Sequence, residues 1–171
     1  MEVPATLGDM ESVTRGGSLS GNPTESGWER LRLLPQLWEL DLWDCMLTEL
    51  PEALAGTDSV TRLALNVNPI DRGWEHLSSL RQLRVLVLYE CQITELAATL
   101  VGMESVTSLS LSDNRIERGW ERLRLLPQLR ELDLDDCGLT EVPAVVESVT
   151  WLGLSWNTCC GCLIPAVGKA E

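Results

Sequence analysis

Phenylalanine is absent from this chain of 171 residues, although hydrophobic residues make up 44% of it. Leucine supplies much of that hydrophobic fraction. An ordinary core mixes aliphatic and aromatic side chains, so a core biased this far towards leucine favours one packing arrangement used repeatedly. The composition therefore predicts an internal repeat.

Basic residues are also few. The chain has 13 Lys and Arg against 26 Asp and Glu, which gives a formal net charge of −13. A chain this acidic repels the phosphates of nucleic acid and the surface of an anionic membrane. We expect neither as a partner and favour a protein partner that carries a basic patch.

Long apolar segments are missing too. No run approaches the roughly 18 consecutive apolar residues of a membrane-spanning helix. The N-terminus, residues 1–6, has no basic segment followed by an apolar one, as a secretory signal would have. We therefore expect a cytoplasmic protein, with a secreted protein as the alternative.

Signatures of catalysis are absent from the sequence. It contains no Gly-rich phosphate loop, no His-Glu-x-x-His and no Gly-x-Ser-x-Gly. His76 is the only histidine, and we interpret it as a solvated residue without a nucleophile beside it. The sequence predicts a protein that is not an enzyme and that has no cofactor and no metal site.

One pattern fills most of the chain. The pattern (Leu/Val)-x-x-Leu-x-Leu-x-x-(Asn/Cys)-x-(Leu/Ile) starts at positions 37, 60, 83, 106 and 129, which are 23 residues apart. A shorter copy starts at 149, only 20 residues later, and a degenerate copy ends at residues 19–22. Copies in register at a fixed period do not arise by chance, and the chain resembles the leucine-rich repeat family over nearly its whole length.

The resemblance implies a repeat solenoid of the α/β type. Each turn contributes a short strand to a parallel β-sheet on the concave face of a curved stack, and irregular or short helical segments return along the convex side. We expect a single leucine-rich repeat domain over residues 1–171 with about seven turns. The first turn, 1–36, is degenerate, turns over 37–148 are regular, and 149–171 form a short last turn and a tail.

The Asn/Cys position of the repeat alternates along the chain. In the family this side chain bonds to the backbone of adjoining turns, and Cys can occupy the same small buried site. The alternation defines a unit of 46 residues, and residues 27–37 are identical to 119–129, which indicates duplication of such units. The predicted structural ladder is Asn22, Cys45, Asn68, Cys91, Asn114, Cys137 and Asn157.

The cysteines divide into two groups. Cys45, Cys91 and Cys137 are two turns apart, so their Cα atoms should be about 9–10 Å from one another, beyond the reach of a disulfide. We expect buried free thiols, which fit a reducing compartment. Residues 159, 160 and 162 are also cysteines. They are a weak zinc signal and faintly resemble the cysteine-rich cap of extracellular leucine-rich repeats, and a short apolar tail over the last turn is the alternative.

Three tryptophans share one position of the repeat. Trp28, Trp74 and Trp120 each follow a glycine on the return side. We favour structural packing of these rings on the convex side, and a row of ligand-binding rings is the alternative.

The outward positions of the strands line the concave face. Acidic residues cluster there at two places four turns apart, and aromatic residues stand between and beyond them, with further acidic residues at the adjacent edge. Aromatic anchors beside charge are typical of interfaces, whereas solubility would account for the carboxylates alone. The predicted partner-binding residues are Glu39, Asp41, Trp43, Asp44, Arg62, Tyr89, Glu131, Asp133, Asp135, Asp136, Trp151 and Trp156.

We therefore expect a non-catalytic protein–protein interaction module. Two alternatives stay open: a recognition fragment of a larger signalling protein or enzyme, and a secreted recognition protein. Residues 2–7 align with 95–100, so the chain begins inside a repeat, which favours a fragment. Uncapped ends would also permit end-to-end association.

Overall fold

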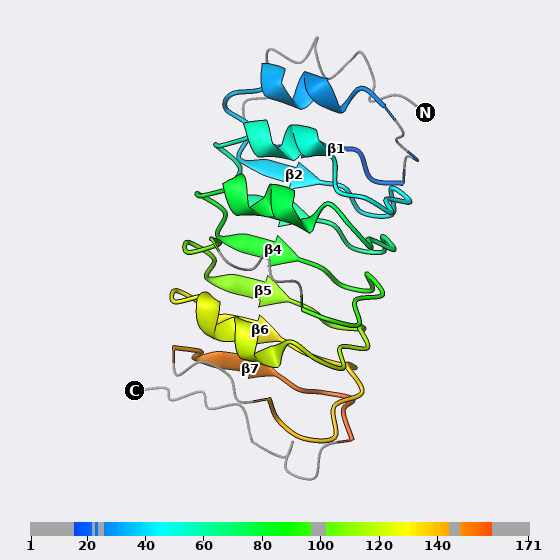
Figure 1. Ribbon diagram of the computed structural model, residues 1–171, viewed down its shortest axis with the longest axis vertical. Coiled ribbons are helices and arrows are strands. Elements are labelled where there is room, and N and C mark those ends of the chain that lie inside the picture. The colour runs from blue at the N-terminus through cyan, green and yellow to red at the C-terminus, as the bar shows by residue number, and fades with distance from the viewer. Residues whose placement is uncertain (1–15, 22, 24–25, 97–101, 144–147, 159–171) are drawn as a thin grey trace.

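The strands lie one beneath another along the long axis of the molecule (Figure 1). The computed structural model describes residues 16–21, 23, 26–96, 102–143 and 148–158. Within them, seven strands form one parallel sheet in chain order. The strands are β1 (Gly17–Ser18), β2 (Glu39–Asp41), β3 (Arg62–Ala64), β4 (Val85–Val87), β5 (Ser108–Ser110), β6 (Glu131–Asp133) and β7 (Trp151–Gly153).

The register of the sheet follows the sequence repeat. The middle residue of each strand from β2 to β6 is a leucine, and each leucine pairs with the leucine of the next strand, as Leu40 does with Leu63. These leucines are buried, while the flanking residues of each strand face outward. No turn could bury its leucine alone, so stacking of the turns creates the core. The structure is the curved leucine-rich repeat solenoid that the sequence predicts.

The returns contain short 3-10 helices, as expected. The described ones are η2 (Trp28–Leu33), η3 (Glu52–Gly56), η4 (Trp74–Ser79) and η6 (Trp120–Leu125). A glycine with positive φ precedes η2, η4 and η6. A Cβ atom at Gly73 would lie 2.6 Å from the carbonyl oxygen of Leu50, so this position needs glycine both for its conformation and for the close approach of the chain.

The side chains of the returns show one difference from the sequence prediction. Trp28, Trp74 and Trp120 are partly buried against the leucine core, which is a packing role. The His76 side chain is only 20% exposed and lies 4.0 Å from Glu75. The interpretation of His76 as a solvated residue is therefore only partly right, because the residue lies on the return side in η4 but most of its side-chain surface is covered.

The asparagines of the ladder connect adjacent turns. Oδ1 of Asn68 accepts hydrogen bonds from the backbone amides of Cys45 (3.0 Å) and Leu47 (2.9 Å), and Nδ2 donates to the carbonyl of Leu42 (2.8 Å). Asn114 and Asn157 make the corresponding bonds to the turns before them. Asn22 lies outside the described residues. Each asparagine thus satisfies buried polar groups of the preceding turn.

The cysteines occupy the same ladder position in the turns that alternate with the asparagine turns. The Sγ atoms of Cys45, Cys91 and Cys137 donate to the carbonyls of Leu19 (3.2 Å), Leu65 (3.2 Å) and Leu111 (3.3 Å), each one turn earlier. All three are buried, and none forms a disulfide within the described part of the chain. Burial raises the pKa of the Cys91 and Cys137 thiols to about 11. These thiols are structural donors and poor nucleophiles at neutral pH.

A second line of contacts joins alternate returns. Arg72 forms an ion pair with Glu49 (2.9 Å), and Arg118 forms the equivalent pair with Glu95 (2.7 Å). The Arg118 guanidinium holds the pKa of Glu95 below its ordinary value, and Arg122 contributes to the same shift.

No helix among the described residues is long and apolar enough to span a bilayer.

Candidate interaction surface

The outward face of the sheet is built from aligned rows. The first and third residues of each strand stand beside their counterparts in the neighbouring strands, so Glu39 is next to Arg62 and Asp133 is next to Ser110. Beyond each strand, backbone hydrogen bonds keep the same register, as from Asp113 N to the carbonyl of Asp135 (2.9 Å). Side chains that are 23 residues apart in sequence therefore form rows across the sheet.

The first acidic cluster is largely satisfied within the protein. Glu39 forms an ion pair with Arg62 at 3.0 Å. Asp41 accepts hydrogen bonds from the Trp43 backbone amide (3.1 Å) and from the Ser20 hydroxyl (2.8 Å). Two of the three predicted carboxylates of this cluster thus have partners, and Asp44 is the exposed member.

The second acidic cluster also supports its own turn. Oδ1 of Asp133 accepts from the backbone amide of Asp135 (3.2 Å), just as Asp41 does from Trp43. Oδ1 of Asp135 accepts from the amide of Ser155 in the next turn (2.7 Å). Glu131 and Asp136 are exposed and have no ion pair among the described residues. Sequence reasoning did not foresee the hydrogen bonds of Asp133 and Asp135 because only the folded turn brings backbone amides towards them.

The least neutralised carboxylates lie where the chain leaves the strands. The turn of β3 has Val67 at this position. We call the four carboxylates of the row, Asp44, Glu90, Asp113 and Asp136, the trailing edge. All four are exposed with positive φ. Partial loss of contact with water, followed by repulsion from Asp136 and Glu90, raises the pKa of Asp113. The trailing edge therefore carries crowded negative charge.

Two members of the trailing edge are missing from the predicted site. Glu90 and Asp113 were assigned to the edge of the concave face and not to the binding residues. The signal was present in the repeat, because both immediately precede the Asn/Cys position, as Asp44 and Asp136 do. Glu90 and Asp113 extend the second acidic cluster to the turns beside Tyr89. The first acidic cluster is four strands from the second, which is roughly 19 Å at the sheet spacing of about 4.8 Å.

Aromatic side chains stand along the same face. Trp43, Tyr89, Trp151 and Trp156 are 48%, 38%, 50% and 86% exposed, as large apolar side chains rarely are. Repulsion from Asp113 and Glu90 raises the pKa of the Tyr89 hydroxyl, which places this ring beside the trailing edge. Trp38, at the start of β2, is 41% exposed and was not predicted. The sequence could have indicated Trp38, because it places a large aromatic ring at a repeat position where the other turns have Thr or Arg.

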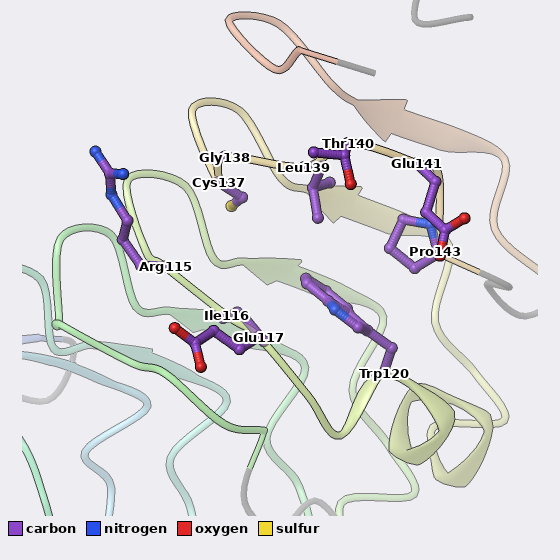
Figure 2. Close-up of a pocket in the computed structure, with 10 residues that line it drawn as sticks. All are labelled: Arg115, Ile116, Glu117, Trp120, Cys137, Gly138, Leu139, Thr140, Glu141 and Pro143. Atoms are coloured by element: carbon purple, nitrogen blue, oxygen red, sulfur yellow. The ribbon is translucent and has the colours of Figure 1, made fainter. Parts of the chain in front are cut away.

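A pocket of about 380 Å³ lies among the last described returns (Figure 2). Trp120, Ile116 and Leu139 supply apolar lining, and polar side chains include Glu117 and Glu141. Figure 2 shows the Trp120 ring facing Leu139 and Pro143, with Arg115 directed away from it. The pocket belongs to the return segments and contains none of the predicted binding residues.

Among the described residues, no group of three or more His, Cys, Asp or Glu is placed to hold a metal ion.

Comparison with known proteins identifies the type of fold. The family model described as Leucine Rich Repeat matches residues 128–147, which contain β6 and its turn. The other turns repeat that structure in one sheet. The chain therefore has the leucine-rich repeat fold. No curated protein matches the sequence of this leucine-rich repeat chain.

Solved structures with the same fold are more distant in sequence. Internalin C2 from Listeria monocytogenes is 22% identical with a TM-score of 0.63, and the alignment covers 86% of this chain and 64% of that one. A leucine-rich repeat protein of Leptospira interrogans is 23% identical with a TM-score of 0.71, covering 91% and 40%. The plant peptide hormone receptor RGFR1, solved in complex with RGF2, is 23% identical with a TM-score of 0.64, covering 91% and 26%. This leucine-rich repeat chain thus spans less than two thirds of the length of each.

Proposed function

We propose that the chain is a protein-interaction module that binds a partner with a basic patch on its concave face. The observation that carries the proposal is the trailing edge beside Tyr89. Its carboxylates have no Lys or Arg partner within the described part of the chain. Partial burial, with added repulsion from Asp136 and Glu90, raises the pKa of Asp113. A cationic partner would relieve this repulsion, so the charge favours association.

The exposed aromatic rings would supply the apolar part of the interface. Tyr and Trp are enriched among the residues that carry most binding energy, because a large rigid ring buries much area with little loss of conformational entropy. Trp43 and Trp151 lie near the two ends of the sheet, and Tyr89 lies between them. We infer that the predicted residues with no internal partner, together with Glu90 and Asp113, form the binding site.

Affinity capture with designed variants tests this proposal. Tyr89→Ala with Asp113→Lys and Asp136→Lys changes the proposed site and leaves the carboxylates that hold the turns, Asp133 and Asp135, in place. We expect wild type to retain a partner that this variant loses, and we expect added salt to weaken the captured complex because exposed charges are screened.

The matched control places the same charge change on the return side. Glu52 in η3 and Glu121 in η6 are exposed and lie outside the sheet. The double variant Glu52→Lys with Glu121→Lys should bind the partner as wild type does. Equal capture by wild type and the concave variant, in proteins that unfold at the same temperature, would show that the concave face is not the site.

A recognition part of a longer protein is the second candidate. It is favoured by the lengths of the similar structures, of which this chain spans 64%, 40% and 26%. The mass of the protein isolated from its source tests it, because a mass near 18.9 kDa contradicts a longer chain.

The cytoplasm is the compartment that we propose, because buried free thiols fit a reducing environment. Secretion is the competing assignment. Counting thiols in the denatured protein without reductant distinguishes them, since six free thiols exclude a disulfide-bonded secreted form.

A further inference from the structure

The edge at which the strands begin differs in charge from the trailing edge. We call the residues immediately before the strands the leading edge, namely Trp38, Thr61, Arg84, Thr107, Arg130 and Thr150. This row contains no carboxylate, and its charged members are Arg84 and Arg130. The trailing edge contains no Lys or Arg. The two sides of the sheet therefore carry opposite charge.

The leading edge is held firmly by the backbone. Arg84 N donates to the carbonyl of Thr61 (2.8 Å), and the hydroxyl of Thr107 donates to the carbonyl of Arg84 (3.2 Å). Thr150 bonds to the carbonyl of Arg130 in the same way (3.2 Å). Both arginines are exposed, and neither has an ion pair within the part of the chain that the structure describes. Arg130 donates one hydrogen bond from Nη1 to the carbonyl of Ser148 (3.1 Å). Its other N–H groups and the guanidinium of Arg84 are available to carboxylates of a partner.

The surface between the two edges is uncharged in the middle of the sheet. β4 presents Val85 and Val87, and β5 presents Ser108 and Ser110, all half-buried. The chain advances six residues from Arg84 to Glu90, three of them in β4, so at about 3.3 Å each the edges are at most roughly 20 Å apart. An α-helix has a diameter of about 10–12 Å with its side chains, so one helix fits between the edges.

The spacing along the edges also suits a helix. Glu90, Asp113 and Asp136 stand on successive turns, and parallel strands are about 4.8 Å apart. The pitch of an α-helix is about 5.4 Å, so side chains at i, i+4 and i+7 of a helix that crosses the strands meet successive turns. On the other flank, Arg84 and Arg130 are two turns apart and match residues about seven positions apart.

We propose that the concave face binds an amphipathic helix of a partner protein, with basic side chains along one flank, acidic side chains along the other and a small apolar stripe over β4 and β5. This inference rests on the proposed function and narrows the partner from a basic patch to a two-sided helix. The opposite charges of the edges fix the direction in which the helix lies, because the reversed helix would place like charges together.

Synthetic helical peptides of about 18 residues test the inference. One has Lys and Glu on opposite flanks of an Ala/Leu stripe, a second has the same composition with the charges mixed between flanks, and two others have only Lys or only Glu. Fluorescence anisotropy measures their binding to wild type. We expect the peptide with opposite flanks to bind about tenfold more tightly than the mixed peptide of equal net charge.

Charge reversal of one edge at a time gives the decisive comparison. Arg84→Glu with Arg130→Glu makes both edges acidic and should shift the preference to the all-Lys peptide. Glu90→Lys with Asp113→Lys makes the trailing edge basic beside β4 and β5, opposite Arg84, and should shift the preference to the all-Glu peptide. Arg124→Glu in η6 is the control, with the preference of wild type expected.

Two outcomes contradict the inference in different ways. If wild type prefers the all-Lys peptide to the one with opposite flanks, the two-sided helix is wrong, while the acidic concave face remains a binding site. If no peptide binds, or if the edge variants keep the wild-type order of affinities, the concave face does not recognise charged helices and the inference fails. The proposed function is then decided separately by the affinity capture with the concave variant.

Discussion

Residues that follow the strands adopt a left-handed backbone conformation that most L-amino acids avoid. Asp44 and Asp136 have φ values of 51° and 48°, and Met46 and Gln92 have φ values of 56° and 58°. Asp and Asn tolerate this region better than other residues, and glycine enters it without strain. The trailing edge is thus acidic at positions where the backbone also restricts the choice of residue.

Met46 and Gly138 form a natural pair for a stability test. They occupy equivalent positions 92 residues apart, and a Cβ at Gly138 would meet no atom within 4 Å. Met46 is 66% exposed, so its removal loses little burial. We expect Met46→Gly to stabilise the protein by about 1 kcal/mol, since the strain of an L-residue disappears.

The reverse change, Gly138→Met, should destabilise the protein by a similar amount, about 1 kcal/mol, because space is available and only the conformation is strained. Urea denaturation measures both. A loss of stability in Met46→Gly would show that the Met46 side chain makes a contact that matters more than its backbone strain.

The buried thiols predict a defined chemical behaviour. The pKa of Cys91 and Cys137 rises from 9.0 to about 11, so near neutral pH their thiolate fraction is about 100-fold lower than that of an ordinary thiol. We expect both to resist alkylation in the folded protein and to react after denaturation, as mass spectrometry of the labelled peptides would show. Fast labelling of either residue under native conditions would contradict their burial.

The same shift affects stability at high pH. A folded-state pKa above the unfolded value means that the stabilisation is complete below pH 9.0 and is lost as pH rises towards about 11. We expect the melting temperature to fall across this interval in wild type. Cys91→Ala should reduce that part of the fall, since it removes one of the titrating groups.

At the scale of elements, the unit of structure is a pair of unlike turns. Asn114 accepts from the amides of Cys91 and Ile93 and donates to the carbonyls of Leu88, Leu111 and Ser112. A buried thiol can replace only part of this set, because it has one weak donor. The alternation of Asn and Cys in the sequence therefore matches a difference in bonding between the two turns.

Removal of one ladder asparagine should be among the most damaging single changes. Asn114→Ala leaves several buried backbone groups without partners, and we expect a loss of about 4 kcal/mol in the free energy of unfolding. Asn66→Ala is the matched control, because its Oδ1 makes a single bond, to Tyr89 N (3.2 Å), at the surface. It should cost about 1 kcal/mol or less. Equal losses in the two variants would contradict the central role of the ladder.

At the scale of the whole molecule, the effect of the net charge of −13 is seen along the trailing edge, in the raised pKa of Asp113. The pKa of Asp113 is raised in the folded state, so its favourable contribution exists only below the unfolded pKa and is lost as pH rises through the folded value. Glu95 has the opposite sign, because Arg118 lowers its pKa, and its contribution is lost as pH falls. The ionised Asp113 therefore opposes folding near neutral pH.

Asp113→Asn should raise the melting temperature by about one or two degrees near neutral pH in low salt. The gain should shrink in about 0.5 M salt, where exposed charges are screened, and vanish in acid, where Asp113 itself is protonated. Thermal denaturation followed by circular dichroism measures this. A gain that is the same at every salt concentration would show that repulsion is not its cause.

Most of the fold could be predicted from the sequence, because a fixed period of 23 residues determines the strands, the buried leucines and the parallel register together. For the predicted binding residues, the sequence indicated only that they lie on the concave face. Alternation of side chains indicated that Asp133 and Asp135 point outward, but their bonds to Asp135 N and Ser155 N arise from the geometry of the folded turns. The role of each proposed site residue in binding stays a prediction.

The hydrogen bonds of the ladder run in one direction along the chain. Asn68 completes the turn that contains Cys45, and Cys91 in turn donates to Leu65 of the turn before it. During synthesis the earlier turn emerges from the ribosome first, since chains grow from the N-terminus. A nascent chain of this protein therefore ends in an unfinished turn, and a pause after a cysteine turn leaves more of these backbone groups unpaired than a pause one turn later.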